Sequence, residues 1–108
     1  MFPKLLVSAG QAAYRLWGKL TPARVTVDGL DWSYLVGGRG EPVLFVHGYG
    51  ADKYRFGPVV PSLTRFHRVV VPDLPGFGES TKDAALPYDI TSQTERLANF
   101  IDAIGLRR

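Results

Sequence analysis

The 108-residue chain contains no cysteine. This absence excludes a disulfide framework, a thiolate metal site and a cysteine nucleophile, and it is compatible with a reducing compartment. The chain has only two histidines, His47 and His67, and a predicted helix and strand separate them. Two such ligands are too few for a metal centre, and the glycine-containing loops lack the spacing of dinucleotide- and phosphate-binding loops. We therefore expect no metal and no cofactor.

The net positive charge is confined to the N-terminal segment. The net charge is +3, but residues 1–27 carry four basic side chains and no acid, so the remaining residues sum to −1. The body of the chain has no stripe of basic residues interleaved with aromatic ones, which argues against nucleic-acid binding. The N-terminal apolar run is also too short and too interrupted to cross a bilayer, which takes about 20 residues.

The first 22 residues have the periodicity of an amphipathic helix, apolar on one side and basic or polar on the other, as in a helix at a membrane surface. The apolar positions are Phe2, Leu5, Leu6, Ala9, Ala13, Leu16, Trp17 and Leu20. The opposite stripe holds Lys4, Ser8, Gln11, Arg15 and Lys19. We expect a helix over 1–22 that contacts a membrane through residues 2–20 or, alternatively, docks on its own or a partner domain. A secretory leader fits poorly, so the sequence indicates a cytoplasmic or peripheral membrane location.

A β-hairpin is predicted next. Apolar and polar residues alternate on both sides of Asp28-Gly29, which is typical of two strands with one buried face that are joined by a tight turn. Three glycines within residues 37–40 then predict a mobile loop.

Two strands and two helices are predicted after this loop. The segments Pro42–His47 and His67–Asp73 are apolar on both faces, as strands covered by helices must be. A short helix lies between them, with apolar positions at Phe56, Val59, Val60, Leu63 and Phe66. A longer amphipathic helix follows, with its face at Ile90, Thr94, Leu97, Ala98, Ile101 and Ile104. Ser92 with Glu95 fits a capping box, and Gly105 is placed to end this helix.

This alternation of strands and helices predicts an α/β fold with parallel βαβ packing. Ligands in such sheets bind beyond the carboxyl ends of the strands. The loops "HGYGADK" and "DLPGFGES" both lie at those ends, so the sequence places any site there.

The segments "VLFVHGYGADKYRF", "RVVVPDLPGFGES" and "YDITSQTERLANFIDAIGL" together resemble the N-terminal part of an α/β-hydrolase. The similarity is greatest to lipase- and esterase-like members related to monoacylglycerol lipases, and it covers residues 24–108. The resemblance implies a partial α/β-hydrolase domain over 23–108, with a hairpin and parallel strands flanked by helices. It also implies an ester or lipid as the substrate.

In this family the His-Gly loop supplies half of the oxyanion hole. The resemblance assigns this donor to the backbone N–H of Tyr49, just after Gly48, and gives His47 the role of holding the loop. A fixed N–H stabilises the charge that develops on a carbonyl oxygen, and losing one such donor costs about 2.7–4 kcal/mol. Gly48 and Gly50 allow a sharp turn close to the substrate. The alternative is an ordinary glycine turn after a strand.

The second loop is expected to be shaped by its own residues. Asp73 and Ser80 are assigned to hydrogen bonds with local backbone groups, or alternatively to contacts with the active-site loops. Pro75 fixes φ, while Gly76 and Gly78 permit left-handed conformations. Ser80 is not expected to be a nucleophile, because "GESTK" ends in lysine and lies in a loop, away from the strand-to-helix turn where the nucleophile elbow occurs.

No G-x-S-x-G occurs in the sequence, so no nucleophile, acid or base is identifiable. The sequence therefore predicts a fragment of a serine hydrolase for carboxylic esters, truncated before the nucleophile elbow and inactive by itself. Gly50 stands where family members that act on epoxides or alkyl halides commonly carry proline, which favours esters, while carbon–carbon bond hydrolysis stays open. The alternative is a non-catalytic membrane-associated or interaction module with the same fold. Truncation is expected to leave Pro42–His47 as an open apolar edge.

Overall fold

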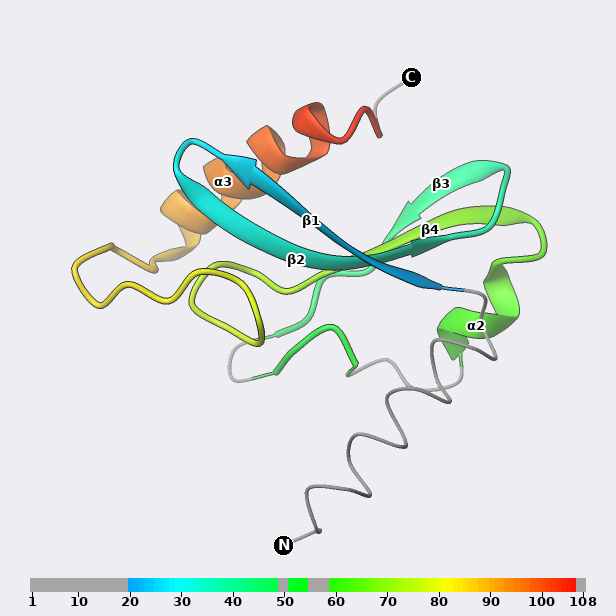
Figure 1. Ribbon diagram of the computed structural model, residues 1–108, viewed down its shortest axis with the longest axis horizontal. Coiled ribbons are helices and arrows are strands. Elements are labelled where there is room, and N and C mark those ends of the chain that lie inside the picture. Colours follow the sequence, from blue (N-terminus) through cyan, green and yellow to red (C-terminus); the bar gives the residue numbers. More distant parts are fainter. Residues whose placement is uncertain (1–19, 49–50, 55–58, 107–108) are drawn as a thin grey trace, which may run out of the picture.

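The computed structural model of the protein describes residues 20–48, 51–54 and 59–106 (Figure 1). Its elements are β1 (Thr21–Val27), β2 (Leu30–Gly37), β3 (Glu41–Leu44), α2 (Val59–Leu63), β4 (His67–Pro72) and α3 (Ile90–Ala103). The helix predicted over residues 1–22 falls almost wholly outside the described residues. Thr21 and Pro22, its last two residues, lie in β1, so the first strand begins before the predicted domain boundary.

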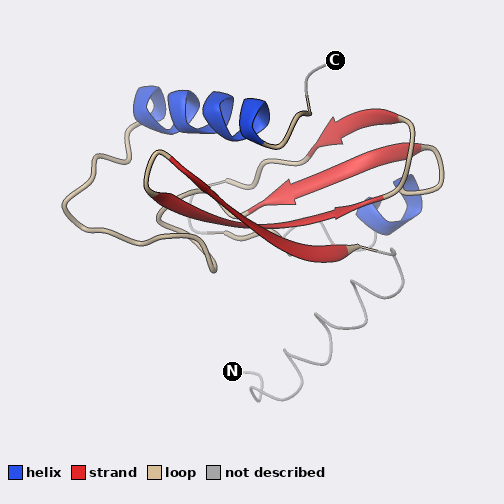
Figure 2. Cartoon of the chain, turned by 45° about the horizontal axis from the view of Figure 1, so that its top comes forward, coloured by secondary structure: helices blue, strands red, loops and turns tan. Residues whose placement is uncertain are grey.

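The four strands form one mixed sheet in the order β1-β2-β4-β3. β2 pairs antiparallel with both β1 and β4, whereas β3 and β4 are parallel and are connected through α2. The helix α3 covers one face of the sheet and α2 lies on the other (Figure 2). The predicted α/β class and the parallel βαβ unit are therefore confirmed.

The hairpin between β1 and β2 turns where the sequence predicted. Asp28 and Gly29 both have positive φ, at 51° and 79°, which suits the two-residue turn that matches the twist of the flanking strands. The expectation of one buried face is wrong for β2, because Trp32, Ser33 and Leu35 are all buried. β2 is an inner strand with apolar side chains packed on both faces, so its alternating pattern underestimates its burial.

The glycine-rich loop after β2 packs closely against the connection between α2 and β4. Gly38 and Gly40 have φ of 82° and 121°. A Cβ at Gly38 would overlap the carbonyl of His67, and one at Gly40 would overlap that of Phe66. The glycines are thus required by close approach of two backbones.

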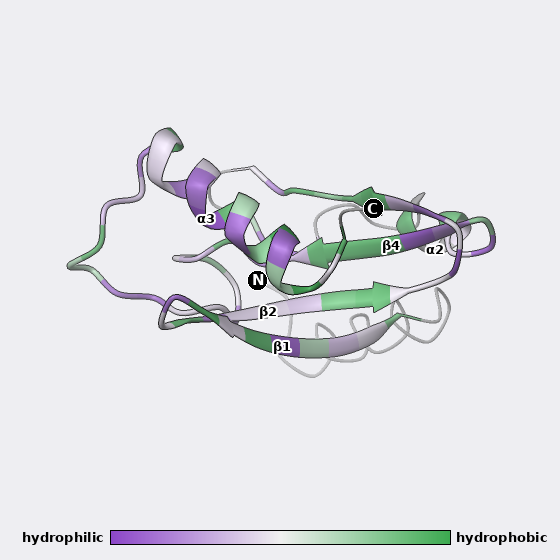
Figure 3. Ribbon diagram, turned by 90° about the horizontal axis from the view of Figure 1, so that it is seen from above, coloured by the Kyte–Doolittle hydropathy of each residue, from purple (hydrophilic) through white to green (hydrophobic). Residues whose placement is uncertain are grey.

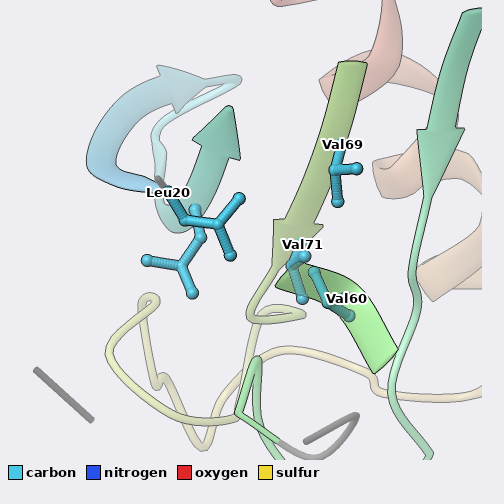
Figure 4. Packing of buried hydrophobic residues seen from close by; sticks show 5 residues of the cluster. Leu20, Val60, Val69 and Val71 are labelled. Atoms are coloured by element: carbon cyan, nitrogen blue, oxygen red, sulfur yellow. The ribbon is translucent and has the colours of Figure 1, made fainter. Parts of the chain in front are cut away.

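Two apolar clusters sandwich the sheet. The cluster on the α2 face contains Leu20, Leu35, Val60, Val69 and Val71 (Figure 4). The cluster on the α3 face contains Trp32, Val70, Phe100 and Leu106. Successive side chains of a strand point to opposite faces, so the valine run of β4 supplies both clusters. The prediction that His67–Asp73 is covered on both faces is confirmed for Val69 to Val71.

Phe100 is the side chain that fixes α3 on the sheet, although it was not in the predicted apolar face. It is fully buried and stacks on Trp32, with ring centroids 4.4 Å apart. Two predicted helix positions are instead exposed: Ile90 at 85% and Phe66 at 71%. Ile90 is the first residue of α3, and Phe66 follows the end of α2. Both residues therefore lie at or beyond the end of a helix, where the sheet does not cover them.

The ends of α3 show one wrong and one correct prediction. The N-cap is Asp89, whose carboxylate accepts hydrogen bonds from the backbone N–H and hydroxyl of Ser92. Ser92 therefore lies inside the first turn, and the predicted capping box with Glu95 is wrong. Gly105 does end the helix, with φ of 69° and its N–H donating to the carbonyl of Asp102 at 3.2 Å.

The N-cap is expected to make the stability of α3 depend on pH in the acid range. The pKa of Asp89 lies below its ordinary value because its carboxylate accepts the Ser92 hydroxyl and backbone N–H. A lowered folded-state pKa means a contribution that is present at neutral pH and lost as the pH falls below about 4. NMR titration is expected to give a midpoint for Asp89 below that of an unperturbed aspartate, and a midpoint at or above it would contradict the cap. Asp89→Asn keeps a capping oxygen and is expected to lose this part of the acid dependence.

β3 is an edge strand, because only β4 pairs with it among the described strands. Its hydrophobic residues therefore lie at one edge of the sheet (Figure 3). The expectation that Pro42–His47 is a strand buried on both faces is wrong: the strand ends at Leu44, and Val46 is 39% exposed. An edge strand has a neighbour on one side only, so its side chains are covered less well.

The edge position of β3 is expected to make the isolated 108-residue chain associate with itself. An apolar strand with a neighbouring strand on one side only invites pairing with another chain, and a lysine near such an edge opposes it. Sedimentation velocity at micromolar concentration is expected to show dimers or larger species, and Val46→Lys is expected to reduce them. A stable monomer in the unsubstituted chain would contradict the prediction.

Candidate active site

Two loops meet beyond the carboxyl ends of the parallel strands β3 and β4 (Figure 1). The first leaves β3 and contains His47 and Gly48, and the second leaves β4 and contains residues 73–81. The backbone N–H of Leu74 donates to Nε2 of His47 at 3.0 Å, which joins the loops directly. The predicted meeting of the two motifs at one edge of the sheet is therefore observed.

The hydrogen bonds of His47 fix its tautomer. A backbone N–H can only donate, so Nε2 is the acceptor from Leu74 and Nδ1 carries the proton. Nδ1 lies 2.8 Å from the carbonyl oxygen of Gly48 and donates to it. The ring is buried and packs edge-on against Phe77, with centroids 5.4 Å apart. Both nitrogens are thus engaged with backbone groups, and the side chain holds the first loop against the second.

A buried ion pair makes a second connection between the loops. Lys53 is 1% exposed, and its Nζ lies 2.6 Å from Oδ2 of Asp73 and 2.7 Å from Oε1 of Glu79. The backbone N–H of Lys53 also donates to Oδ1 of Asp73 at 2.6 Å. Oδ2 accepts a further bond from the backbone N–H of Glu79 at 2.9 Å. One fully buried carboxylate therefore ties together Lys53 and the turn after β4.

The protonated state of Lys53 is favoured despite its burial. Desolvation alone lowers the pKa of a buried lysine. Here the hydrogen bonds and charges of Asp73 and Glu79 outweigh desolvation and hold the pKa of Lys53 above its ordinary value. The ammonium group is therefore charged throughout the physiological range and acts as a fixed cation, which is unsuited to proton transfer.

Ser80 uses its hydroxyl in the scaffold. Its Oγ accepts the backbone N–H of Ser33 at 2.9 Å and donates to the carbonyl of Asp73 at 2.6 Å. Gly78 lies directly over the carboxylate of Asp73 with φ of 54°, and a Cβ there would overlap that carboxylate. Gly76 has φ of 93°, and a Cβ there would overlap the ring of Tyr88. These residues shape the loop around the buried Asp73.

An apolar hollow of about 230 Å³ opens beside these loops. Val46 lines it from the first loop, Leu74 and Phe77 line it from the second, and Leu97 lines it from α3. An apolar hollow at the edge of the sheet where ligands of α/β folds bind is suited to the apolar part of a ligand.

The predicted site residues not yet described are Gly48, Tyr49 and Gly50. Gly48 is exposed, has space where a Cβ would lie and does not have positive φ, so its backbone conformation does not require glycine. Tyr49 and Gly50 lie outside the described residues. His67 is at the opposite end of β4, where its Nδ1 lies 3.3 Å from the carbonyl of Glu41.

The described ranges, residues 20–48, 51–54 and 59–106, lack two kinds of feature. No group of His, Cys, Asp or Glu in them has the arrangement of a metal site. None of their helices has the length and apolar character needed to cross a membrane.

Sequence reasoning gave Lys53 no role. The available signal was weak: a lysine follows one strand and an aspartate follows the adjacent parallel strand, so both lie near the same edge of the sheet. Their spacing of 20 residues carries no periodicity, and only the folded loops bring the two charges together.

Residues 41–108 match the family model of the α/β hydrolase fold. Together with the mixed sheet and the loops described above, this match shows that the chain belongs to the α/β-hydrolase family. The resemblance that the two strand-end motifs indicated is confirmed.

The relatives within this family include lipases. Lipase 1 of Psychrobacter immobilis is 40% identical over 67 residues, which are 62% of this chain and 21% of that protein. Monoacylglycerol lipase abhd6-A of Xenopus laevis is 31% identical over 83 residues, which are 72% of this chain and 25% of that protein. The predicted similarity to lipase-like members of the family, including monoacylglycerol lipases, is therefore confirmed.

A solved structure agrees with this placement. The crystal structure of a membrane phospholipase A, described as a bacterial virulence factor, is 40% identical and superimposes with a TM-score of 0.91. The superposition covers 96% of this chain and 34% of that one. The chain thus spans about a fifth to a third of the length of the proteins it matches.

Proposed function

We propose that these 108 residues are the N-terminal part of a longer serine hydrolase that cleaves carboxylic esters. The observation that supports this most directly is the joining of the His47 loop to the β4 loop through the Leu74 N–H, beside an apolar hollow. That arrangement holds a strand-end loop at the edge of the sheet where ligands of α/β folds bind.

In the proposed mechanism, the backbone N–H of Tyr49 donates to the oxygen of the ester carbonyl as it gains charge. Because the donor is fixed in advance, no reorganisation is needed when the charge appears. Gly48 and Gly50 keep side chains away from this oxygen, and His47 supports the loop. The nucleophile, its base and the orienting acid are proposed to come from residues beyond this chain.

Lipid-like esters are the proposed substrates. The hollow beside the loops is lined mainly by apolar side chains, which suits an acyl chain or another apolar group. Relatives named lipase, monoacylglycerol lipase and phospholipase agree with this choice. Gly50, where epoxide-acting members commonly have proline, further favours esters.

The test is expression of the complete reading frame that encodes these residues, followed by an assay with a short p-nitrophenyl ester. Hydrolysis is expected, and an organophosphonate that modifies active-site serines is expected to abolish it. The 108-residue chain alone is expected to be inactive. Ester hydrolysis by that chain alone would contradict the proposal. A reading frame with no strand–serine–helix turn downstream would instead favour the non-catalytic module.

Peripheral membrane contact through residues 2–19 belongs to the same proposal, whereas Leu20, the last residue of the predicted contact, is buried in the cluster on the α2 face. It is supported by the amphipathic pattern of that segment, with a basic stripe opposite an apolar one. Co-sedimentation with anionic vesicles is expected for the complete protein and is expected to weaken when residues 1–19 are removed. Equal binding by both forms would exclude this role for the segment.

A further inference from the structure

We propose that Lys53 is a positioning residue whose buried ion pair holds residues 51–54 against the end of β4. The inference rests on the proposed function, because residues 51–54 lie close in the sequence to Tyr49, the proposed oxyanion donor. Lys53 acts through Asp73 and Glu79 and does not touch the substrate.

The position of Lys53 is fixed through both its backbone and its side chain. Its N–H donates to one oxygen of Asp73 and its Nζ pairs with the other, at 2.6 Å each. Asp73 is itself tied to the sheet, since its own N–H donates to the carbonyl of Ser33 in β2 at 2.8 Å. Lys53 is therefore connected to the sheet through a single buried carboxylate.

His47 is a second residue that anchors the first loop to the loop after β4. His47 accepts the N–H of Leu74, the residue next to Asp73. The two anchors, His47 and Lys53, flank residues 48–52 in the sequence. His47 binds Leu74 and Lys53 binds Asp73, and these are the first two residues after β4. The loop is thus held at both ends by adjacent residues of one neighbouring strand end.

Stability alone does not explain a lysine at this position. Burying an ammonium group is unfavourable, and a well-packed apolar side chain of similar volume is often as stabilising as a buried ion pair. An apolar side chain could fill the space in several rotamers, however, whereas the Nζ of Lys53 reaches both carboxylates in only one side-chain conformation. We infer that the ion pair is kept for the position it imposes on the loop.

The experiment compares Lys53→Met, Lys53→Arg and Glu79→Gln with the unsubstituted complete protein. Lys82→Met is the matched control, because Lys82 is an exposed lysine in the β4–α3 connection. Hydrogen exchange is measured by mass spectrometry on peptides that contain residues 51–54 and, separately, on peptides from β4. Initial rates with a p-nitrophenyl ester give kcat and KM for each variant.

Lys53→Met is expected to increase the rate of amide hydrogen exchange at residues 51–54 by about tenfold or more, because a hydrogen bond to a charged group is lost. The exchange rates in β4 are expected to change less. Lys53→Met is also expected to lower kcat by about tenfold or more with KM nearly unchanged, since a displaced oxyanion donor acts on the transition state. Lys53→Arg is expected to restore much of both properties, because arginine keeps the charge and can reach two carboxylates. Glu79→Gln is expected to act in the same direction with a smaller effect, and Lys82→Met is expected to change neither property.

Equal acceleration of exchange in the loop and in β4, with kcat per folded molecule unchanged, would overturn the inference by showing a purely structural role. If Lys53→Met does not fold, Glu79→Gln decides: faster exchange confined to residues 51–54 supports the inference, and no change overturns it. Absence of ester hydrolysis in the unsubstituted protein would refute the proposed function, while the exchange measurements would still decide whether Lys53 positions the loop.

Discussion

Replacing Asp73 with alanine is expected to lower the free energy of unfolding by about 3–5 kcal/mol, because it leaves a buried charge without its main partner. The remaining anionic partner of Lys53 is Glu79, whose side chain is 61% exposed. Two backbone N–H groups, those of Lys53 and Glu79, also lose their acceptor. Urea denaturation followed by circular dichroism measures the loss.

Two further variants test the cause of this loss. Asp83→Ala removes an exposed carboxylate from the same connection and is expected to change stability by less than about 1 kcal/mol. Adding Lys53→Met to Asp73→Ala is expected to recover part of the loss, because the unpaired ammonium is then gone. A loss below about 1 kcal/mol for Asp73→Ala would contradict the buried ion pair.

The same pair sets a pH dependence at the alkaline end. Because the pKa of Lys53 is raised in the folded protein, its contribution to stability is fully present below the ordinary lysine pKa of about 10.4 and is lost as the pH rises above the folded-state value. Between pH 7 and 9 the contribution of this pair is therefore expected to be constant. A fall in stability over that range that disappears in Lys53→Met would contradict the assignment.

Tyr49→Pro is expected to lower kcat of the complete protein by a factor of about 10²–10³, equivalent to about 2.7–4 kcal/mol of transition-state stabilisation. Proline has no backbone N–H, so the substitution removes the proposed oxyanion donor. Tyr49→Phe keeps the N–H and is expected to retain near-normal kcat. Initial rates with a p-nitrophenyl ester measure both variants.

Stability measurements separate loss of the donor from loss of the fold. Both Tyr49 variants are expected to give urea midpoints close to that of the unsubstituted protein. A folded Tyr49→Pro protein with unchanged kcat would show that another group stabilises the oxyanion, and a large loss in Tyr49→Phe would shift the role to the side chain.

Local signals predicted the fold well where they depended on backbone geometry. Asp28-Gly29 takes the positive φ values of a tight hairpin turn, and Gly105 ends α3 in the left-handed region. Both follow from steric limits that apply within a few residues. The N-cap was misplaced because Asp89 and Ser92 are both good caps, and which one starts the helix depends on the direction from which the chain enters it.

Predictions of burial failed where the cover comes from distant residues. β2 alternates in sequence yet is buried on both faces, and Phe100 contacts Trp32 across 68 positions of the chain. Ile90 has the correct helical phase but lies at the end of α3, where it is 85% exposed. Periodicity gives the direction of a side chain, but another element has to be present to cover it.

The sequence by itself determined the α/β class, the parallel strand pair and the placement of two glycine-rich loops at one edge of the sheet, because these follow from short-range apolar patterns and turn chemistry. Only the tertiary structure decided that His47 spends both ring nitrogens on backbone groups and that Lys53 pairs with Asp73. The contacts of His47 with Leu74 and of Lys53 with Asp73 join residues 20 or more positions apart, and their strength depends on exclusion of water, which no local pattern in a sequence encodes.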